Sequence, residues 1–146
     1  MPSRSEFDPP NHAYSHPLSV ERVDIDELGH ANNVVWVRWV NEAAIAHSRS
    51  VGLGPEAYFA LRILWVVRRH DIEYLLPALE GDALEARTWI GTMRGATSLR
   101  RTVIRRDGRP LLHAATTWAL IDRESGKPRR IPKEIIERYG FSGSAA

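Results

Sequence analysis

The segment of residues 34–50 constrains the fold more than any other part of the chain. It contains neither glycine nor proline, an Asn32-Asn33 pair precedes it, and Gly52 follows shortly after its end. Asn is a favoured helix N-cap residue and Gly a favoured helix terminator, so this segment predicts a single helix. Apolar side chains occupy most of its circumference. Such a helix belongs in the middle of a fold, where other elements surround it.

Segments that favour β-strands flank this helix in the sequence. A short strand is expected at residues 19–25 and a helical turn at 55–61. Alternating patterns rich in β-branched residues then predict four longer strands, at residues 62–75, 83–92, 98–106 and 111–121. Asp107-Gly108 is a hairpin signal, and Pro132 suits the first turn of a short C-terminal helix. The order predicts an α+β fold, with an antiparallel sheet wrapped around one long central helix.

Length and composition fit a single domain of this kind. The chain has 146 residues, is 43% hydrophobic and contains no cysteine. We expect a flexible N-terminal arm at residues 1–16, the folded domain at 17–140 and a flexible tail at 141–146. The absence of cysteine excludes disulfides and a cysteine nucleophile. No membrane-spanning run and no secretory signal are recognised, so a cytoplasmic protein is expected, and the uncovered face or edge of the sheet predicts a homo-oligomer.

Positive charge is concentrated in one part of the chain. Residues 94–130 hold ten Lys and Arg but only three acids, although the net charge of the whole chain is +2. This excess is compatible with a polyanionic partner, and it is also compatible with a solvated sheet face. The chain has no groove-reading motif and no pattern of stacking aromatics, so a nucleic-acid partner is not expected.

A polar cluster precedes the long helix and contains Asp24, Asp26, His30, Asn32 and Asn33. One interpretation is that Asp26 and the two asparagines cap the helix. Another is that the free N–H groups at the helix start form an oxyanion hole, with a carboxylate placed opposite. The second arrangement contains the groups that ester or thioester hydrolysis requires. No further His stands at a metal-ligand spacing, so neither a metal nor a cofactor is expected.

Residues 24–33, DIDELGHANN, resemble the D-x-D-x-x-G-H-x-N-N/Y signature of hotdog thioesterases. This is the family of 4-hydroxybenzoyl-CoA and acyl-CoA thioesterases. Weaker similarity is found at residues 36–42, 67–74, 77, 81–82 and 122–131, so the resemblance covers about residues 19–135. It implies a single hotdog domain with thioester hydrolase activity.

The resemblance also implies roles for three residues of the motif. Asp26 matches the catalytic carboxylate, which acts either as general base on water or as nucleophile on the thioester. The backbone N–H of Asn33 matches the group that polarises the thioester carbonyl, although Asn replaces the aromatic residue of some members. His30 is expected to orient water or to line the pocket.

The substrate implied by the resemblance is an acyl-CoA, bound in a homodimer or homotetramer whose active sites lie at subunit interfaces. Thr97 and Ser98 are expected to complete the site from the partner subunit. Arg94, Arg100 and Arg129 are expected to contact the phosphates of CoA. An acyl-ACP thioesterase and a non-catalytic acyl-CoA or acyl-ACP binding protein remain as alternatives. A hotdog dehydratase does not fit, because its Asp and His are five positions apart with a Pro between them, whereas His30 follows Asp26 by four.

Overall fold

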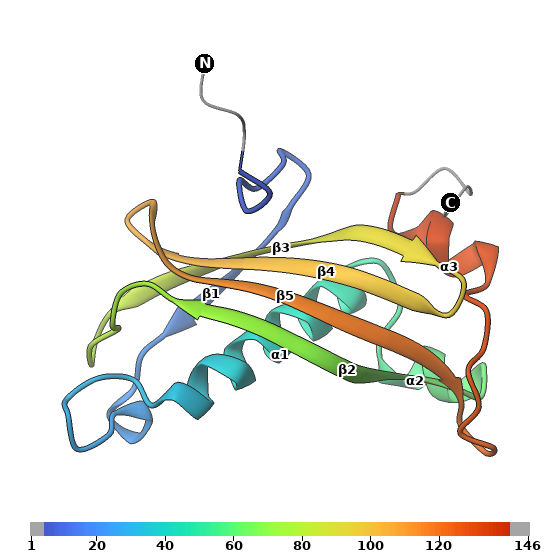
Figure 1. Ribbon diagram of the computed structural model, residues 1–146, viewed down its shortest axis with the longest axis horizontal. Coiled ribbons are helices and arrows are strands. Elements are labelled where there is room, and N and C mark those ends of the chain that lie inside the picture. Colours follow the sequence, from blue (N-terminus) through green and yellow to red (C-terminus); the bar gives the residue numbers. More distant parts are fainter. Residues whose placement is uncertain (1–4, 141–146) are drawn as a thin grey trace. The chain divides into compact units, whose positions relative to one another are not determined.

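The structure is a computed structural model that describes residues 5–140 (Figure 1). Its elements in chain order are β1 (Tyr14–Ser19), the 3₁₀-helix η1 (Arg22–Asp24), α1 (Asn33–Ser50), α2 (Pro55–Ala60), β2 (Ile63–Tyr74), β3 (Ala83–Arg94), β4 (Thr97–Arg106), β5 (Arg109–Asp122) and α3 (Lys133–Arg138). Among these residues, no helix is both long enough and apolar enough to cross a membrane.

The five strands form one sheet in the order β1-β3-β4-β5-β2. β1 pairs antiparallel with β3, with Leu18 opposite Leu84. At the other edge, the N–H of Leu75 donates to the carbonyl of Leu111 (2.9 Å), and the N–H of Arg123 donates to the carbonyl of Arg62 (3.0 Å). The end of β2 thus lies beside the start of β5, which makes this pair antiparallel as well. The predicted α+β class, with an antiparallel sheet and one long helix, is confirmed.

Turn and cap residues in the sequence predicted the positions of several elements correctly. The long helix, expected at residues 34–50, is α1. The hairpin expected at Asp107-Gly108 joins β4 to β5, and both residues have a positive φ, 51° and 78°. This is the backbone geometry of a two-residue hairpin turn, and it explains why Asp and Gly stand there.

The first strand is an exception. A strand was expected at residues 19–25, but β1 ends at Ser19 and residues 22–24 form η1. The reason is a reciprocal turn in which the N–H of Asp24 donates to the carbonyl of Glu21 (2.9 Å) and the N–H of Glu21 donates to the Asp24 carboxylate (2.9 Å). β1 begins at Tyr14, inside the range 1–16 that was expected to be a flexible arm. The expected tail at 141–146 lies outside the described residues.

The chain divides into two compact units, each with its own packed residues. The first unit contains Met1–Ala44, Ile72–Trp89 and Arg101–Ala114. In its core, apolar side chains from the first half of α1 pack against strands β1, β3, β4 and β5. The buried members include Trp36, Trp39, Val40, Ala43, Leu84, Ala86, Ile104, Leu112 and Ala114. The buried residues of α1, which are Trp36, Trp39, Val40, Ala43 and Ala44, lie at the spacing of a single helix face. The expectation that other elements surround this helix is therefore wrong for the described residues, since Val34 and Ile45 are exposed.

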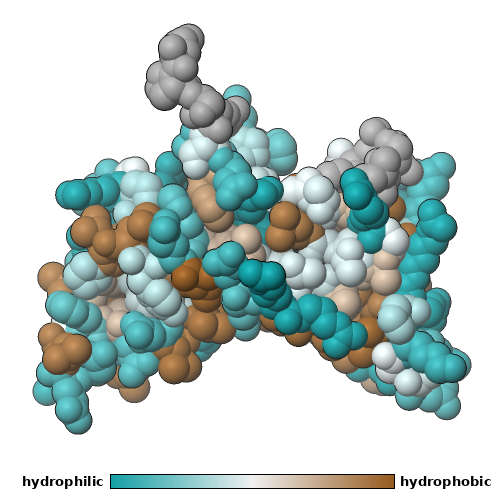
Figure 2. All heavy atoms as spheres, in the orientation of Figure 1, coloured by the Kyte–Doolittle hydropathy of each residue, from teal (hydrophilic) through white to brown (hydrophobic). Residues whose placement is uncertain are grey.

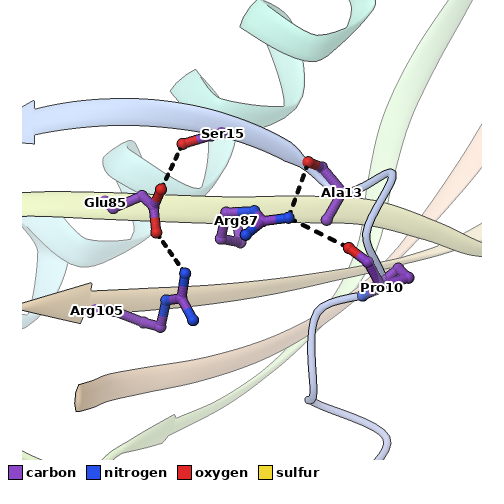
Figure 3. A network of polar contacts seen from close by, with 6 residues as sticks. All are labelled: Pro10, Ala13, Ser15, Glu85, Arg87 and Arg105. Carbon is purple, nitrogen blue, oxygen red and sulfur yellow. Dashed lines mark hydrogen bonds and ion pairs between the residues drawn. The ribbon is translucent and has the colours of Figure 1, made fainter. Parts of the chain in front are cut away.

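Residues before β1 also contact the sheet within the first unit. The ring of Phe7 stacks on His113, with centroids 4.4 Å apart. Figure 3 shows Arg87 of β3 donating to the carbonyls of Pro10 and Ala13, both at 3.2 Å. Nearby, Glu85 accepts hydrogen bonds from Ser15 (2.7 Å) and Arg105 (2.5 Å). The segment between residues 5 and 13 therefore has specific partners in β3 and β5.

The second unit contains Ile45–Asp71, Ile90–Arg100 and Ala115–Ala146. Its core joins α2, the start of β2, the end of β3 and α3. The buried members are Leu53, Tyr58, Ile63, Ile90, Met93, Leu120, Ile131, Ile135 and Ile136. Burial raises the pKa of the Tyr58 hydroxyl well above its ordinary value. The short α3 exists because its two isoleucines join this core, since six residues are too few for an isolated helix.

Candidate active site

The segment that carries the predicted catalytic residues is a closed loop in the first unit. The N–H of Asn32 donates to the carbonyl of Asp24 (2.9 Å), and the N–H of Asp26 donates to the carbonyl of His30 (2.9 Å). The N–H of Gly29 donates to the carbonyl of Asp26 (3.0 Å). Gly29 has a φ of 81°, which glycine adopts without strain. Backbone hydrogen bonds thus bring Asp26, His30 and the helix start together.

The Asp26 side chain is half-buried and turns back on its own loop. Its Oδ1 accepts the N–H of Leu28 at 2.9 Å. Within residues 5–140 the structure gives Oδ2 no hydrogen-bond donor. The hydrogen bond to Oδ1 therefore orients the carboxylate, and Oδ2 is available for another interaction. Asp26 does not cap α1, so that part of the capping interpretation is wrong.

Asn32 is the residue that caps α1. Its Oδ1 accepts the N–H of Val34 (2.9 Å), and its carbonyl accepts the N–H of Val35 (2.9 Å). Asn33 is the first helical residue and is exposed, and among the described residues its N–H has no acceptor. The carbonyl of Asn33 accepts the Tyr74 hydroxyl at 3.2 Å. An exposed, uncommitted N–H at the positive end of a long helix is suited to bind a polarised carbonyl oxygen.

An ion pair between a buried carboxylate and a half-exposed arginine joins this loop to the helix. Asp24 is only 2% exposed, and its Oδ1 lies 2.9 Å from Arg38 Nη2 in the second turn of α1. Arg38 Nε also lies 3.3 Å from Glu42 Oε1. The hydrogen bond that Arg38 donates to the Asp24 carboxylate raises the pKa of the Arg38 guanidinium. Arg38 carries no local sequence signal of this role, because the carboxylate that it pairs with stands 14 positions earlier in the chain.

Large apolar side chains are exposed around the loop. Val23 is 83% exposed, Leu28 81% and Val34 74%. In Figure 2, hydrophobic surface is seen at the left of the view, where Figure 1 draws the segment between β1 and α1. His30 is also exposed. The candidate catalytic carboxylate is therefore bordered by apolar surface of the kind that marks contact with a ligand or another chain.

The five residues predicted to bind substrate all belong to the second unit. Arg94 and Thr97 are exposed at the turn between β3 and β4, and the Thr97 hydroxyl donates to the carbonyl of Arg94 (3.1 Å). Arg129 is also exposed and forms an ion pair with Asp122 (2.9 Å). Ser98 is buried.

Arg100 differs from the other two predicted arginines because it is buried. Its Nη1 lies 2.9 Å from His47 Nδ1, and its guanidinium lies 6.0 Å from the centroid of the Tyr139 ring. The same ring lies edge-on to His47, and its hydroxyl contacts Ser48. Burial lowers the pKa of Arg100. Within residues 5–140, no group of three or more His, Cys, Asp or Glu is arranged to hold a metal ion.

Comparisons with known proteins agree on one class. The family model of the acyl-ACP thioesterase N-terminal domain matches residues 11–139. The acyl-CoA thioester hydrolase YbgC of Escherichia coli is 31% identical over 125 residues, which cover 84% of this chain and 92% of that relative.

Solved structures give the same picture of the fold. A probable thioesterase from Bartonella henselae superimposes with a TM-score of 0.77 at 25% identity, covering 82% of this chain and 99% of that one. A Staphylococcus aureus protein, solved in complex with CoA, superimposes with a TM-score of 0.81 at 13% identity, covering 86% of this chain and 80% of that one.

Proposed function

Because the chain belongs to the hotdog-fold thioesterases of the acyl-ACP thioesterase family and is a thioester hydrolase, we propose that it hydrolyses an acyl-CoA to the free acid and CoA. The name of its Escherichia coli relative supports CoA as the carrier. The observation that carries the proposal is the loop of residues 24–33, in which an oriented carboxylate and an uncommitted helix N–H belong to one hydrogen-bonded segment.

In the proposed mechanism the thioester carbonyl oxygen accepts the N–H of Asn33, which polarises the carbonyl carbon. Asp26 acts in one of two ways. As general base it takes a proton from water while the water oxygen bonds to the carbonyl carbon; as nucleophile its carboxylate attacks that carbon and water cleaves the resulting anhydride. In both cases the carbon–sulfur bond breaks and the sulfur leaves as the thiolate of CoA, which then takes up a proton. The helix dipole stabilises the negative charge that develops on the carbonyl oxygen.

The remaining predicted residues are proposed to bind or orient. His30, exposed at the end of the loop, orients the attacking water or lines the pocket. Arg94 and Arg129 are exposed, which suits contact with the CoA phosphates. Arg100 is buried, so it contacts a phosphate only if its side chain moves to the surface. Thr97 and Ser98 are proposed to act from the partner subunit.

We propose a homodimer or homotetramer as the working form and the cytoplasm as its location. The exposed Val23, Leu28 and Val34 support an oligomer, because a monomer rarely leaves neighbouring large apolar side chains in water. An acyl-ACP substrate is the second candidate, and the description of the matching family model favours it. Because the chain is a thioester hydrolase, the alternative of a non-catalytic binding protein no longer applies.

The test measures free-thiol release from short, long and aromatic acyl-CoAs, with acyl-ACPs assayed in parallel. Asp26→Asn keeps the Oδ1 acceptor for Leu28 and so preserves the loop, and we expect its turnover to fall by about 10²- to 10⁴-fold. The matched control is Glu27→Gln, which removes the neighbouring exposed carboxylate and is expected to retain turnover. Normal turnover in Asp26→Asn would reject Asp26 as the catalytic carboxylate. Thiol release from acyl-ACP alone would select the second candidate.

A further inference from the structure

The carboxylate of Asp24 is buried and paired with an arginine, and the proposed reaction does not use it. Both of its oxygens are engaged: Oδ1 with Arg38 at 2.9 Å and Oδ2 with the N–H of Glu21 at 2.9 Å. Burying a charge is costly unless it is paired and hydrogen-bonded, and removing one partner leaves a strongly destabilised group. A buried carboxylate in this position therefore fixes the geometry around it more firmly than an exposed pair would.

This ion pair connects the two halves of the candidate site. Asp24 stands two residues before Asp26, and its carbonyl also accepts the N–H of Asn32, the residue that caps α1. Arg38 projects from α1, five residues after Asn33. The side chain of Asp24 thus bonds to the body of the helix, while its backbone bonds to the residue at the helix start. Glu42 also pairs with this guanidinium, because its Oε1 lies 3.3 Å from Arg38 Nε.

We propose that Asp24, through Arg38, is a positioning residue that sets the distance between the Asp26 carboxylate and the N–H of Asn33. This inference rests on the proposed function, because it assigns those two groups to the reaction. The two groups belong to different elements, a loop and a helix, and misplacement by about 1 Å lowers rates by about 100-fold. The binding of the acyl group and of CoA depends less on this distance than the rate of the chemical step does.

Three variants test the proposal in the full-length protein. Asp24→Asn and Arg38→Met each break the ion pair, and we expect kcat to fall by about 10- to 100-fold while KM changes by less than about threefold. Arg38→Lys keeps a positive charge and a donor, so it should recover part of the lost kcat. This partial recovery separates positioning from a general loss of folded protein.

The matched control is Glu85→Gln. Glu85 belongs to the same unit and also forms a charged hydrogen bond with an arginine, Arg105 at 2.5 Å, but its partners Ser15 and Arg105 lie outside the loop (Figure 3). We expect this variant to lower the melting temperature and leave kcat unchanged. If Asp24→Asn behaves like Glu85→Gln, with a lower melting temperature and wild-type kcat, the proposal is wrong.

A second measurement is independent of turnover. Amide hydrogen exchange at Asn32 reports the bond to the Asp24 carbonyl, and exchange there should accelerate in Asp24→Asn but not in Glu85→Gln. Unchanged protection at Asn32 overturns the positioning role even if no thioester is hydrolysed. A wild-type protein without thiol release, by contrast, rejects the proposed function and leaves the exchange result to decide the positioning role.

Discussion

Replacing Asn32 by Asp changes the charge at the start of α1 while keeping its cap. The Oδ1 of Asn32 accepts the N–H of Val34 at 2.9 Å, and a carboxylate oxygen accepts the same donor. Asn and Asp are about equally good N-caps, and a negative charge near a helix N-terminus adds about 0.3 to 1 kcal/mol of stability. Asn32→Ala, which loses the acceptor, should cost about 0.5 to 2 kcal/mol instead. The stability order is therefore Asp, then Asn, then Ala.

Catalysis should follow a different order. In the proposed mechanism negative charge develops on an oxygen bound to the N–H of Asn33, the residue next to position 32. Two negative charges about 6 Å apart repel by about 1.4 to 2.8 kcal/mol for an effective dielectric constant of about 20 to 40. Each 1.36 kcal/mol corresponds to about tenfold in rate, so kcat of Asn32→Asp should fall by about 10- to 100-fold.

The assay pairs urea denaturation with thiol release for the wild type, Asn32→Asp and Asn32→Ala. The expected result is a variant, Asn32→Asp, that is at least as stable as the wild type and clearly slower. If Asn32→Asp were fully active, the developing charge would not lie at the start of α1, and Asn33 would lose its proposed role. Raising the salt concentration should restore part of its activity, because screening weakens the repulsion.

Two further predictions concern stability. Burial lowers the pKa of His70, whose Nδ1 lies 2.9 Å from the Thr116 hydroxyl, so the unfolded chain binds that proton more readily than the folded one. The free energy of unfolding should therefore fall as the pH drops from about 6.5 to the lowered pKa of the folded state. His70→Gln should show a weaker pH dependence. A wild-type free energy of unfolding that is the same at pH 5 and pH 8 would contradict this prediction. Leu112→Ala removes a side chain that is fully buried in the first unit and should cost about 2 to 5 kcal/mol in urea denaturation, whereas a cost below about 1 kcal/mol would mean that this core is not packed as described.

The parts of the fold that local chemistry controls were predicted from the sequence. The bounds of α1 follow from an asparagine cap, a run without Gly or Pro, and Gly52 with its φ of 79°. The Asp107-Gly108 hairpin follows from the positive φ that its turn requires. The start of β1 was missed, because its strand pairing with β3 depends on residues about 70 positions away. Local propensity carries no information about such a partner.

The same distinction between local and long-range interactions applies to the candidate site. By itself the sequence determined that an acid, a His and an Asn pair stand in one short segment before a long helix, since spacing along the chain is local. Only the tertiary structure decided that Asn32 rather than Asp26 caps the helix, that Arg100 is buried against His47, and that Arg38 pairs with the buried Asp24. The physical reason is that burial and ion pairing depend on which chain segments meet when the apolar core forms, and that meeting is a property of the whole fold.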